Sequence, residues 1–147
     1  MLRTLILAFV MTATALSAAS AQNLEVIKER QELLEAMGKA SKDPGKMMKQ
    51  EIPFDKATVE AALDTFIEKA PKLPELFPDD SKEGGKTEAL PAIWENKKDF
   101  TDRFAKLVAD AKAAKGQIND EFEMMEKWPT VVGNCGGCHK KYREKKQ

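Results

Sequence analysis

The sequence predicts an all-α protein that folds as an antiparallel four-helix bundle. Two observations lead to this fold class. Four stretches place apolar residues at helical spacing, and past residue 21 almost no stretch alternates apolar and polar residues as a half-buried strand does. The length of 147 residues also suits a single domain. Helices of about 20 residues would be roughly 30 Å long, so four of them can enclose one core.

The first helix is expected over about residues 24–41. Its apolar face is formed by Leu24, Ile27, Leu34 and Met37. The charged residues of this stretch fall mostly on the other faces. The run Asp43-Pro44-Gly45 is expected to end the helix, because proline and glycine both disfavour a helix interior.

The second helix is expected to begin after Asp55, a good N-cap residue, with Phe54 packed onto Val59. Its apolar stripe is formed by Val59, Ala62, Leu63, Phe66, Ile67 and Ala70. Two prolines follow and should end the helix. Residues 71–86 are then expected to form a long loop, and loops of this length are usually functional or mobile.

The third helix is expected to begin near Pro91, because proline is favoured in a first helical turn, and to end at Gly116. Its buried face is formed by Ile93, Phe100, Phe104, Leu107, Val108 and Ala111. Lys112 and Lys115 lie in the last turn, where positive charge suits the helix dipole.

The fourth helix is expected to begin at Asn119 or Asp120, with Glu123 completing a capping box. One face is predicted to carry Ile118, Phe122, Met125, Val132, Cys135, His139 and Tyr142. Pro129 interrupts this stretch and is expected to kink the helix or to split it in two.

Residues 1–21 are expected to be a secretory signal peptide and not part of the fold. A single charge, Arg3, precedes a short apolar run, and Ala19-Ser20-Ala21 forms an A-x-A cleavage site. The alternative, a membrane anchor, is disfavoured because the strongly apolar run is too short to span about 30 Å of hydrocarbon. Residues 22–147 would then form the mature domain, located in the periplasm if the source is a Gram-negative bacterium.

Composition and charge exclude several classes of function. The chain has 24 basic and 24 acidic residues, so there is no electrostatic reason to expect binding to nucleic acid or to an anionic membrane. No acid–base pair, activated nucleophile or phosphate-binding loop is apparent in the sequence. We therefore expect no enzyme activity of the hydrolytic or group-transfer kind.

The two cysteines and the single histidine of the chain fall in one motif, Cys135-Gly136-Gly137-Cys138-His139. This is the C-x-x-C-H signature of haem attachment, in which two thiols add across two vinyl groups of a porphyrin and the histidine binds the iron. On a helix all three side chains would share a face. A structural zinc site would be one ligand short, and a thioredoxin-type dithiol needs a preceding strand, so haem attachment is favoured.

Together with the four helices, three blocks make the chain resemble the cytochrome c′ family, the class II c-type cytochromes. The blocks are Arg30-Gln31 in the first helix, residues 87–94 (TEALPAIW) before the third, and residues 135–143 (CGGCHKKYR) near the C-terminus. The resemblance covers nearly the whole mature chain, and a motif so close to the C-terminus is typical of this class. It implies a four-helix bundle around one covalently attached haem c.

The resemblance implies roles for the residues of the C-terminal block. Cys135 and Cys138 would hold the haem, and His139 would be the fifth ligand of the iron. Arg143, one helical turn beyond His139, would flank the proximal face of the haem.

Four residues from the other two blocks would approach the haem edge. The resemblance implies that Arg30 and Gln31 lie near the propionates, and that Thr87 and Glu88 line the edge from the loop before the third helix. From the residues alone, a solvent-exposed position is the ordinary expectation for Arg30 and Glu88.

Leu34 occupies the position that faces the sixth coordination site of the iron in this family, where low-spin members carry a methionine ligand. Leucine has no donor atom, so the resemblance implies a five-coordinate, high-spin haem that can take nitric oxide or carbon monoxide. Leu34 and Met37 would form the floor of the distal pocket, together with an aromatic residue such as Phe66 or Trp94. Met37 is the one nearby donor, but a packing role is favoured because methionine commonly fills gaps in cores.

Two functions stay open at this point. A vacant iron position favours the binding of small neutral gases, whereas a six-coordinate, low-spin iron with a methionine ligand would favour electron transfer to a periplasmic redox partner. A helical interaction protein without a cofactor would leave the motif unexplained.

The resemblance also implies a homodimer packed through the first two helices. A basic C-terminal run could steer an acidic redox partner, or it could simply complement the dipole of the last helix. The run consists of Lys140, Lys141, Arg143, Lys145 and Lys146.

Overall fold

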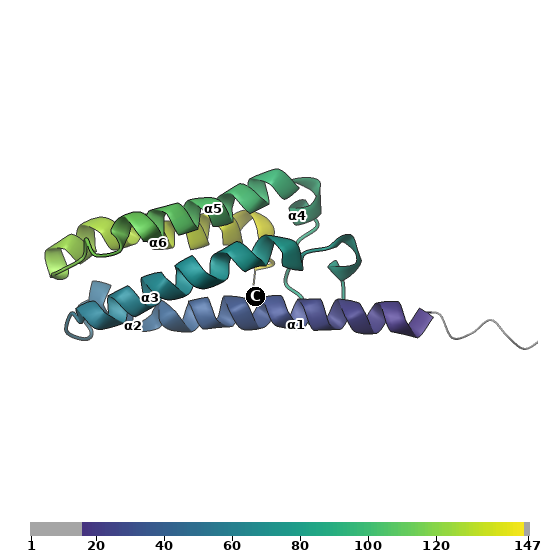
Figure 1. The fold of residues 1–147 in the computed structure, drawn as a ribbon, viewed down its shortest axis with the longest axis horizontal. Helices are drawn as coiled ribbons and strands as arrows, with labels where there is room; N and C mark the ends of the chain where they lie inside the picture. The colour runs from purple at the N-terminus through teal and green to yellow at the C-terminus, as the bar shows by residue number, and fades with distance from the viewer. Residues whose placement is uncertain (1–15, 146–147) are drawn as a thin grey trace, which may run out of the picture.

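A computed structural model of the protein describes residues 16–145, with side chains from residue 24 onward. Four long helices form the predicted antiparallel bundle (Figure 1): α1 (Leu16–Ala40), α3 (Lys56–Lys69), α5 (Lys97–Ala114) and α6 (Glu121–Tyr142). Between them lie two short helices, α2 (Lys42–Met48) and α4 (Ala92–Glu95), and two 3₁₀ segments, η1 (Ala70–Leu76) and η2 (Asp79–Ser81). Residues 1–15, most of the expected signal peptide, lie outside the described part, so that expectation remains a prediction.

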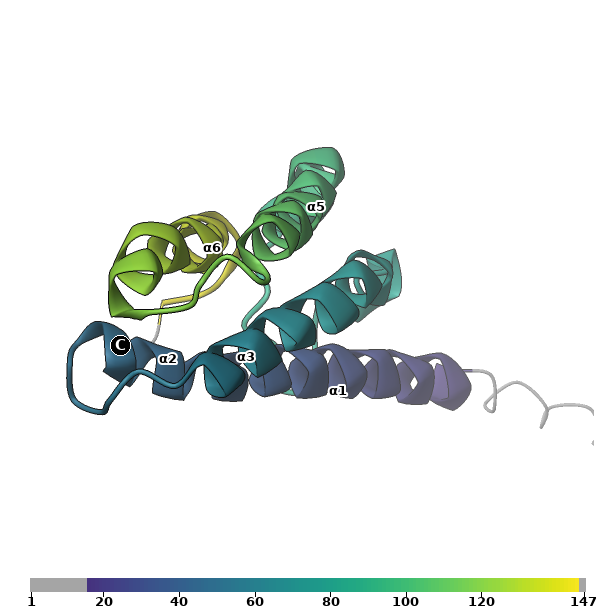
Figure 2. The ribbon, with the colours of Figure 1, turned by 60° about the vertical axis from the view of Figure 1, so that its left-hand side comes forward.

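The long helices pack in chain order, α1 on α3, α3 on α5 and α5 on α6. Figures 1 and 2 show α5 and α6 as one layer lying over α1 and α3. Within residues 16–145 there is no strand, only an isolated antiparallel bridge between Ala89 and Arg143. No helix in the described part is long and apolar enough to cross a membrane.

α1 is already helical at Leu16, where the described part begins, whereas the sequence predicted a start near residue 24. Alanines at positions 18, 19 and 21 favour helix. Its buried face also differs from the prediction. Ile27 and Met37 are buried as expected, but Leu24 and Leu34 are exposed and Arg30 is buried. The spacing of apolar residues did not predict this buried face, because one of its positions is occupied by a charged residue, Arg30.

The first helix ends at Ala40, close to the predicted position. The segment that follows was expected only to end the helix, but it is helical itself. Residues 42–48 form the extra helix α2. Pro44 lies in its first turn, where no backbone N–H is needed for an intrahelical bond, so proline is tolerated there.

α3 begins as predicted at the N-cap Asp55, whose Oδ2 accepts a hydrogen bond from the Thr58 backbone N (3.0 Å). Its buried residues are Val59, Ala62, Leu63 and Phe66. The expectation of a long loop over residues 71–86 was wrong in part, because η1 and η2 lie within it. Proline fixes φ near the value that a 3₁₀ turn needs, so Pro71 and Pro74 are compatible with η1.

The predicted third helix is divided into α4 and α5 by Asn96, which has φ −127° and ψ 45°. Pro91 is the N-cap of α4 and not its first helical residue. Most of the predicted buried face of α5 is confirmed, with Phe100, Phe104, Leu107 and Ala111 buried. Gly116 has φ 73°, a left-handed conformation suited to glycine, and the helix ends just before it as predicted.

α6 is one continuous helix, so Pro129 does not split it. Asp120 caps it by accepting a hydrogen bond from the Glu123 backbone N (2.8 Å), and Glu123 reaches back to the Asn119 backbone N (2.7 Å). Both Pro129 and Met125, whose carbonyl loses its partner at the proline, lie on the solvent side. Water can therefore satisfy the freed carbonyl.

The buried face of α6 is shifted from the prediction. Phe122, with 72% of its surface exposed, and Met125 point away from the core. The buried positions are Met124, Trp128, Val131 and Tyr142. Burial of this face is favoured because it places the large ring of Trp128 in the core, where the ring packs on Phe66 with centroids 6.0 Å apart.

Candidate functional site

A cavity of about 470 Å³ lies between α1, the segment 76–89, α5 and α6. Nine of the residues that the sequence predicted for the haem site line this cavity, although they come from three separate parts of the chain. They are Arg30, Gln31, Leu34, Thr87, Glu88, Cys135, Cys138, His139 and Arg143. A volume of this size lies in the usual range for small-molecule and cofactor sites.

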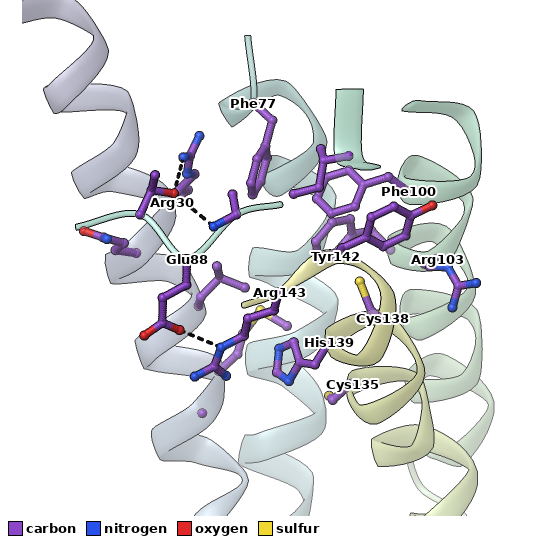
Figure 3. A pocket seen from close by; sticks show the side chains of 18 of the residues that line it. Arg30, Phe77, Glu88, Phe100, Arg103, Cys135, Cys138, His139, Tyr142 and Arg143 are labelled. Atoms are coloured by element: carbon purple, nitrogen blue, oxygen red, sulfur yellow. Dashed lines mark hydrogen bonds and ion pairs between the residues drawn. The ribbon is translucent and has the colours of Figure 1, made fainter. Parts of the chain in front are cut away.

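The two thiols and the imidazole project from the last two turns of α6 into the cavity (Figure 3). Cys135, Cys138 and His139 are three and four residues apart, which places them on one side of the helix. Cys135 and Cys138 are half-buried, and burial raises the pKa of both thiols, that of Cys138 to about 11. Burial, and to a lesser degree Arg143, lowers the pKa of His139. At neutral pH the imidazole therefore keeps a nitrogen lone pair for a metal ion.

The helix that carries these groups is intrinsically weak, because it contains Pro129 and three glycines, Gly133, Gly136 and Gly137. Relative to alanine, each glycine costs about 1 kcal/mol and the proline about 3 kcal/mol. A Cβ atom at Gly136 would meet nothing within 4 Å, so the space beside the motif is open. The helix therefore depends on contacts with the rest of the bundle for its stability.

One such contact joins the end of α6 to the segment before α4. Arg143 Nε donates to Glu88 Oε2 (2.7 Å), as Figure 3 shows. The backbone repeats this link, with the Glu144 N donating to the Glu88 O (2.8 Å) and the Leu90 N donating to the Tyr142 O (3.0 Å). Glu88 and Arg143 are thus brought together at the mouth of the cavity, and neither is an isolated surface charge.

Arg30 is buried, with only 2% of its surface exposed, which overturns the ordinary expectation of a solvated position. Its Nη1 donates to the Leu76 O (3.0 Å) and Ser81 Oγ (2.8 Å), and its Nη2 donates to the Ser81 O (2.9 Å) and Thr87 Oγ1 (2.8 Å). The guanidinium also lies 4.4 Å from the centroid of the Phe77 ring. Burial lowers the pKa of Arg30 to about 10, so it stays charged at neutral pH.

Gln31, next to Arg30, ties the same segment to α1 from outside. Its Nε2 donates to the Gly85 O (3.1 Å) and to the Lys86 O (3.3 Å). Arg30 and Gln31 together hold residues 76–87 against α1, so this segment forms a fixed wall of the cavity.

The apolar part of the wall includes the expected distal residues. Leu34 is 36% exposed because its side chain faces the cavity, whereas Met37 lines the cavity but is 7% exposed and belongs to the core cluster. The expected aromatic partners were wrong. Phe66 packs on Trp128 in the core, and Trp94 donates from Nε1 to the Pro78 O (3.0 Å) outside the cavity.

The aromatic wall is formed instead by residues to which the sequence assigned no role in the haem site. They are Phe77, Phe100, Phe104 and Tyr142. Phe100 makes edge contacts with the other three, at centroid distances of 4.8 to 5.2 Å. The helical stripe containing Phe100 and Phe104 was visible in the sequence, but Phe77 lies in a non-helical segment with no periodic signal.

The donor set and the shape of the cavity fit a large, flat, apolar cofactor. Two thiols and one imidazole share the cavity with a wall of aliphatic and aromatic side chains. Charged groups, among them the buried Arg30 and the Glu88–Arg143 ion pair, also line it. Among the described residues, no group of three or more His, Cys, Asp or Glu side chains is placed so that it could hold a metal ion. A porphyrin attached through Cys135 and Cys138, with its iron bound to His139, uses each of these features.

Comparisons with known sequences agree with this fit. A family model described as Cytochrome C' matches residues 25–143. A cytochrome c′ from Rhodopseudomonas palustris is 48% identical over 122 residues, which cover 83% of this chain and 84% of that protein. A protein named cytochrome c-556 from the same organism is 35% identical over 149 residues, covering 99% of each chain.

Solved structures give the same result. The fold matches that of cytochrome c′ from Rhodopseudomonas palustris with a TM-score of 0.81 at 48% identity, over 83% of this chain and 98% of that one. It matches oxidized cytochrome c556 from the same organism with a TM-score of 0.77 at 32% identity, again over 83% and 98% of the two chains. Sequence motifs, fold and cavity thus point to the same group of proteins.

Proposed function

This chain belongs to the cytochrome c′ family of haem proteins, and we propose that its covalently attached haem c is five-coordinate and high-spin. Cys135 and Cys138 would hold the haem, and His139 would bind the iron on the proximal side. When bound, haem c would supply a redox-active iron able to take up a small neutral gas such as nitric oxide or carbon monoxide.

The observation that carries this proposal is the nature of Leu34. This side chain lines the same cavity as the two thiols and the imidazole, and it has no atom that can donate to a metal. With haem in the cavity, a bulky aliphatic group there would exclude water, and an entering ligand would have to displace it. Because an apolar pocket gives no hydrogen bond to a charged ligand, it favours nitric oxide and carbon monoxide over dioxygen, whose bound form usually needs a polar partner.

The remaining residues of the site would hold and shield the cofactor. Arg30 and Gln31 of α1, together with Thr87, lie on the side of the cavity proposed to face the propionates. Glu88 and Arg143 form an ion pair (2.7 Å) at the mouth, beside His139, which would limit access to the proximal side.

A second function is favoured by one specific observation. Met37 lines the cavity, so its thioether is the available donor if Leu34 moves aside. Ligation by Met37 would give a six-coordinate, low-spin iron suited to electron transfer. Burial of Met37 in the core cluster supports its packing role instead.

We further propose that the mature protein, residues 22–147, is exported to the periplasm, carries one haem and acts as a gas-binding or electron-carrying protein and not as an enzyme. The A-x-A sequence at positions 19–21 supports export. The family resemblance supports a homodimer packed through α1 and α3. A periplasmic redox partner would dock through the basic C-terminal residues.

The absorption spectrum tests the proposal. The full chain is expressed with export and haem-attachment machinery, and spectra of the oxidised and reduced protein are recorded with and without nitric oxide. We expect covalently bound haem, a high-spin reduced spectrum and a change on adding the gas. A low-spin reduced spectrum that does not respond to nitric oxide would contradict the open site and favour Met37 as a ligand.

A further inference from the structure

Two carboxylates of α5 accept hydrogen bonds from α6 side chains on either side of the C-x-x-C-H motif. Neither carboxylate has a role in the site described above. The first is Asp110, whose Oδ2 accepts a hydrogen bond from Asn134 Nδ2 (2.6 Å), one residue before Cys135. Lys106 pairs with the same carboxylate (2.6 Å), so Asp110 is held in place on its own helix.

The second carboxylate is Asp99, which lies beyond the other end of the motif. It accepts hydrogen bonds from the Tyr142 hydroxyl and from Lys141 Nζ (3.0 Å), both on α6. Arg103, one turn along α5, donates to Asp99 as well (2.9 Å) and lies beside Gly137 and Cys138. Figure 3 shows Arg103 and Tyr142 on the α5 side of the motif.

The stretch between these two contacts is the part of α6 that most needs support. Gly136 and Gly137 lie within it, and both lower its helix propensity. A Cβ at Gly136 would meet nothing within 4 Å, whereas one at Gly137 would lie 3.6 Å from Arg103, the residue that donates to Asp99. The backbone bridge to residues 88–90 joins the chain only at Tyr142 and beyond. It does not hold the turn that carries the two thiols.

We propose that Asp99 and Asp110 are positioning residues for haem attachment. They hold the turn 135–139 in one helical register, so that both thiols face the cavity together. The inference rests on the proposed attachment through Cys135 and Cys138. Each thiol adds its S–H across one vinyl C=C. The S–C and C–H bonds that form replace the S–H and C=C π bonds that break, and no oxidant or reductant is consumed.

The test compares the double variant Asp99→Ala/Asp110→Ala with Asp102→Ala. Asp102 is a matched control, because its carboxylate pairs with Lys98 on its own helix, α5 (2.6 Å). Each full chain is expressed with haem-attachment machinery, unfolded and alkylated, so that a free thiol adds one alkyl group to the mass. We expect the ratio of singly to doubly attached haem to rise about tenfold in the double variant, the effect of ~1.4 kcal/mol in local stability. The ratio should not change in Asp102→Ala.

Hydrogen exchange on the haem-loaded proteins separates positioning from general stability. Amides 134–142 should exchange faster in the double variant while those of α3 keep their rates, and Asp99→Glu/Asp110→Glu should restore the original behaviour. An unchanged attachment ratio, or faster exchange in α3 to the same degree, would overturn the inference. Absence of haem from the unaltered chain would contradict the proposed function and this inference with it, whereas haem without any difference between the variants contradicts the inference alone.

Discussion

At the scale of single residues, Arg30 orders the segment between α3 and α4. Its four hydrogen bonds reach Leu76, Ser81 and Thr87, residues 46 to 57 positions away in sequence. No local pattern encodes partners so distant, and a charged residue on an amphipathic helix is ordinarily exposed. The family resemblance placed Arg30 at the site, but only the structure shows that it is a buried clamp.

Replacing Arg30 should therefore destabilise the fold strongly. Arg30→Met keeps most of the side-chain volume but leaves buried oxygens of Ser81 and Leu76 without a donor, and we expect a loss of about 2–4 kcal/mol in the free energy of unfolding. Lys39→Met, which removes an exposed cation of the same helix, should change it by less than about 0.5 kcal/mol. Urea unfolding followed by circular dichroism measures the free energy of unfolding of both variants. Equal losses in the two would contradict a stabilising role for the buried hydrogen bonds of Arg30.

Leu34 is the residue on which the coordination state depends. Leu34→Met places a thioether at the cavity wall, and we expect the reduced protein to shift toward a low-spin spectrum with weaker binding of nitric oxide. Leu33→Met is the control, because Leu33 packs against the core and does not line the cavity. If Leu34→Met leaves the spin state unchanged, Leu34 does not face the iron.

Asp99 should make stability depend on pH in a defined direction. Hydrogen bonds from Arg103, Tyr142 and Lys141 hold the pKa of this carboxyl well below its ordinary range. A carboxyl with a lowered folded-state pKa stabilises the fold above its unfolded pKa of about 3.9, and this contribution is lost as pH falls toward the folded value. The difference in Tm between the unaltered protein and Asp99→Asn should thus be largest near neutral pH and shrink below about pH 4. A difference that stays constant on acidification would argue against a charged Asp99 as the cause.

At the scale of elements, the helices themselves were predictable but their buried faces were less so. Two apolar stripes compete on α6, one through Phe122 and Met125 and the other through Met124 and Trp128. Helical periodicity allows both, and the choice depends on which stripe meets Phe66 and the rest of the core. That is a property of the assembled bundle and not of the helix alone.

Glycines in and after the helices give a matched pair of predictions. Gly133 is helical and a Cβ there meets nothing within 4 Å, so Gly133→Ala should stabilise the protein by about 0.5–1 kcal/mol. Gly116 has equally open space but a φ of 73°, so Gly116→Ala should destabilise it by roughly 1 kcal/mol. Chemical unfolding of both variants measures the sign, and the same sign for the two would contradict this assignment of backbone conformation.

At the scale of the whole molecule, the reactive groups of the site lie close together in the sequence, whereas the residues that form its walls come from distant segments. The motif at residues 135–139 is contiguous, so the thiols and imidazole could be identified directly. The cavity itself is assembled from α1, the segment 76–89, α5 and α6. Phe77 could not have been found from periodicity, because it lies outside any helix and its ring contacts Arg30 and Phe100, residues far from it in the sequence.

Because the haem would fill a cavity bordered by every layer of the bundle, its absence should weaken the whole fold. We expect Cys135→Ser/Cys138→Ser, which cannot attach haem, to unfold at a Tm lower by roughly 10 °C or more, the effect of a few kcal/mol in a chain of this size. The unaltered chain expressed without haem-attachment machinery is the control and should show the same decrease. Equal thermal stability with and without haem would mean that the cavity does not depend on the cofactor.

The central claim is that His139 is the only protein ligand of the iron. The most direct measurement is a crystal structure of the haem-loaded protein in its reduced state without added gas. We expect thioether bonds from Cys135 and Cys138, His139 bound on one face of the haem, and the Leu34 side chain over the other face with no protein atom bonded there. A bond from the Met37 sulfur to the iron would contradict this claim.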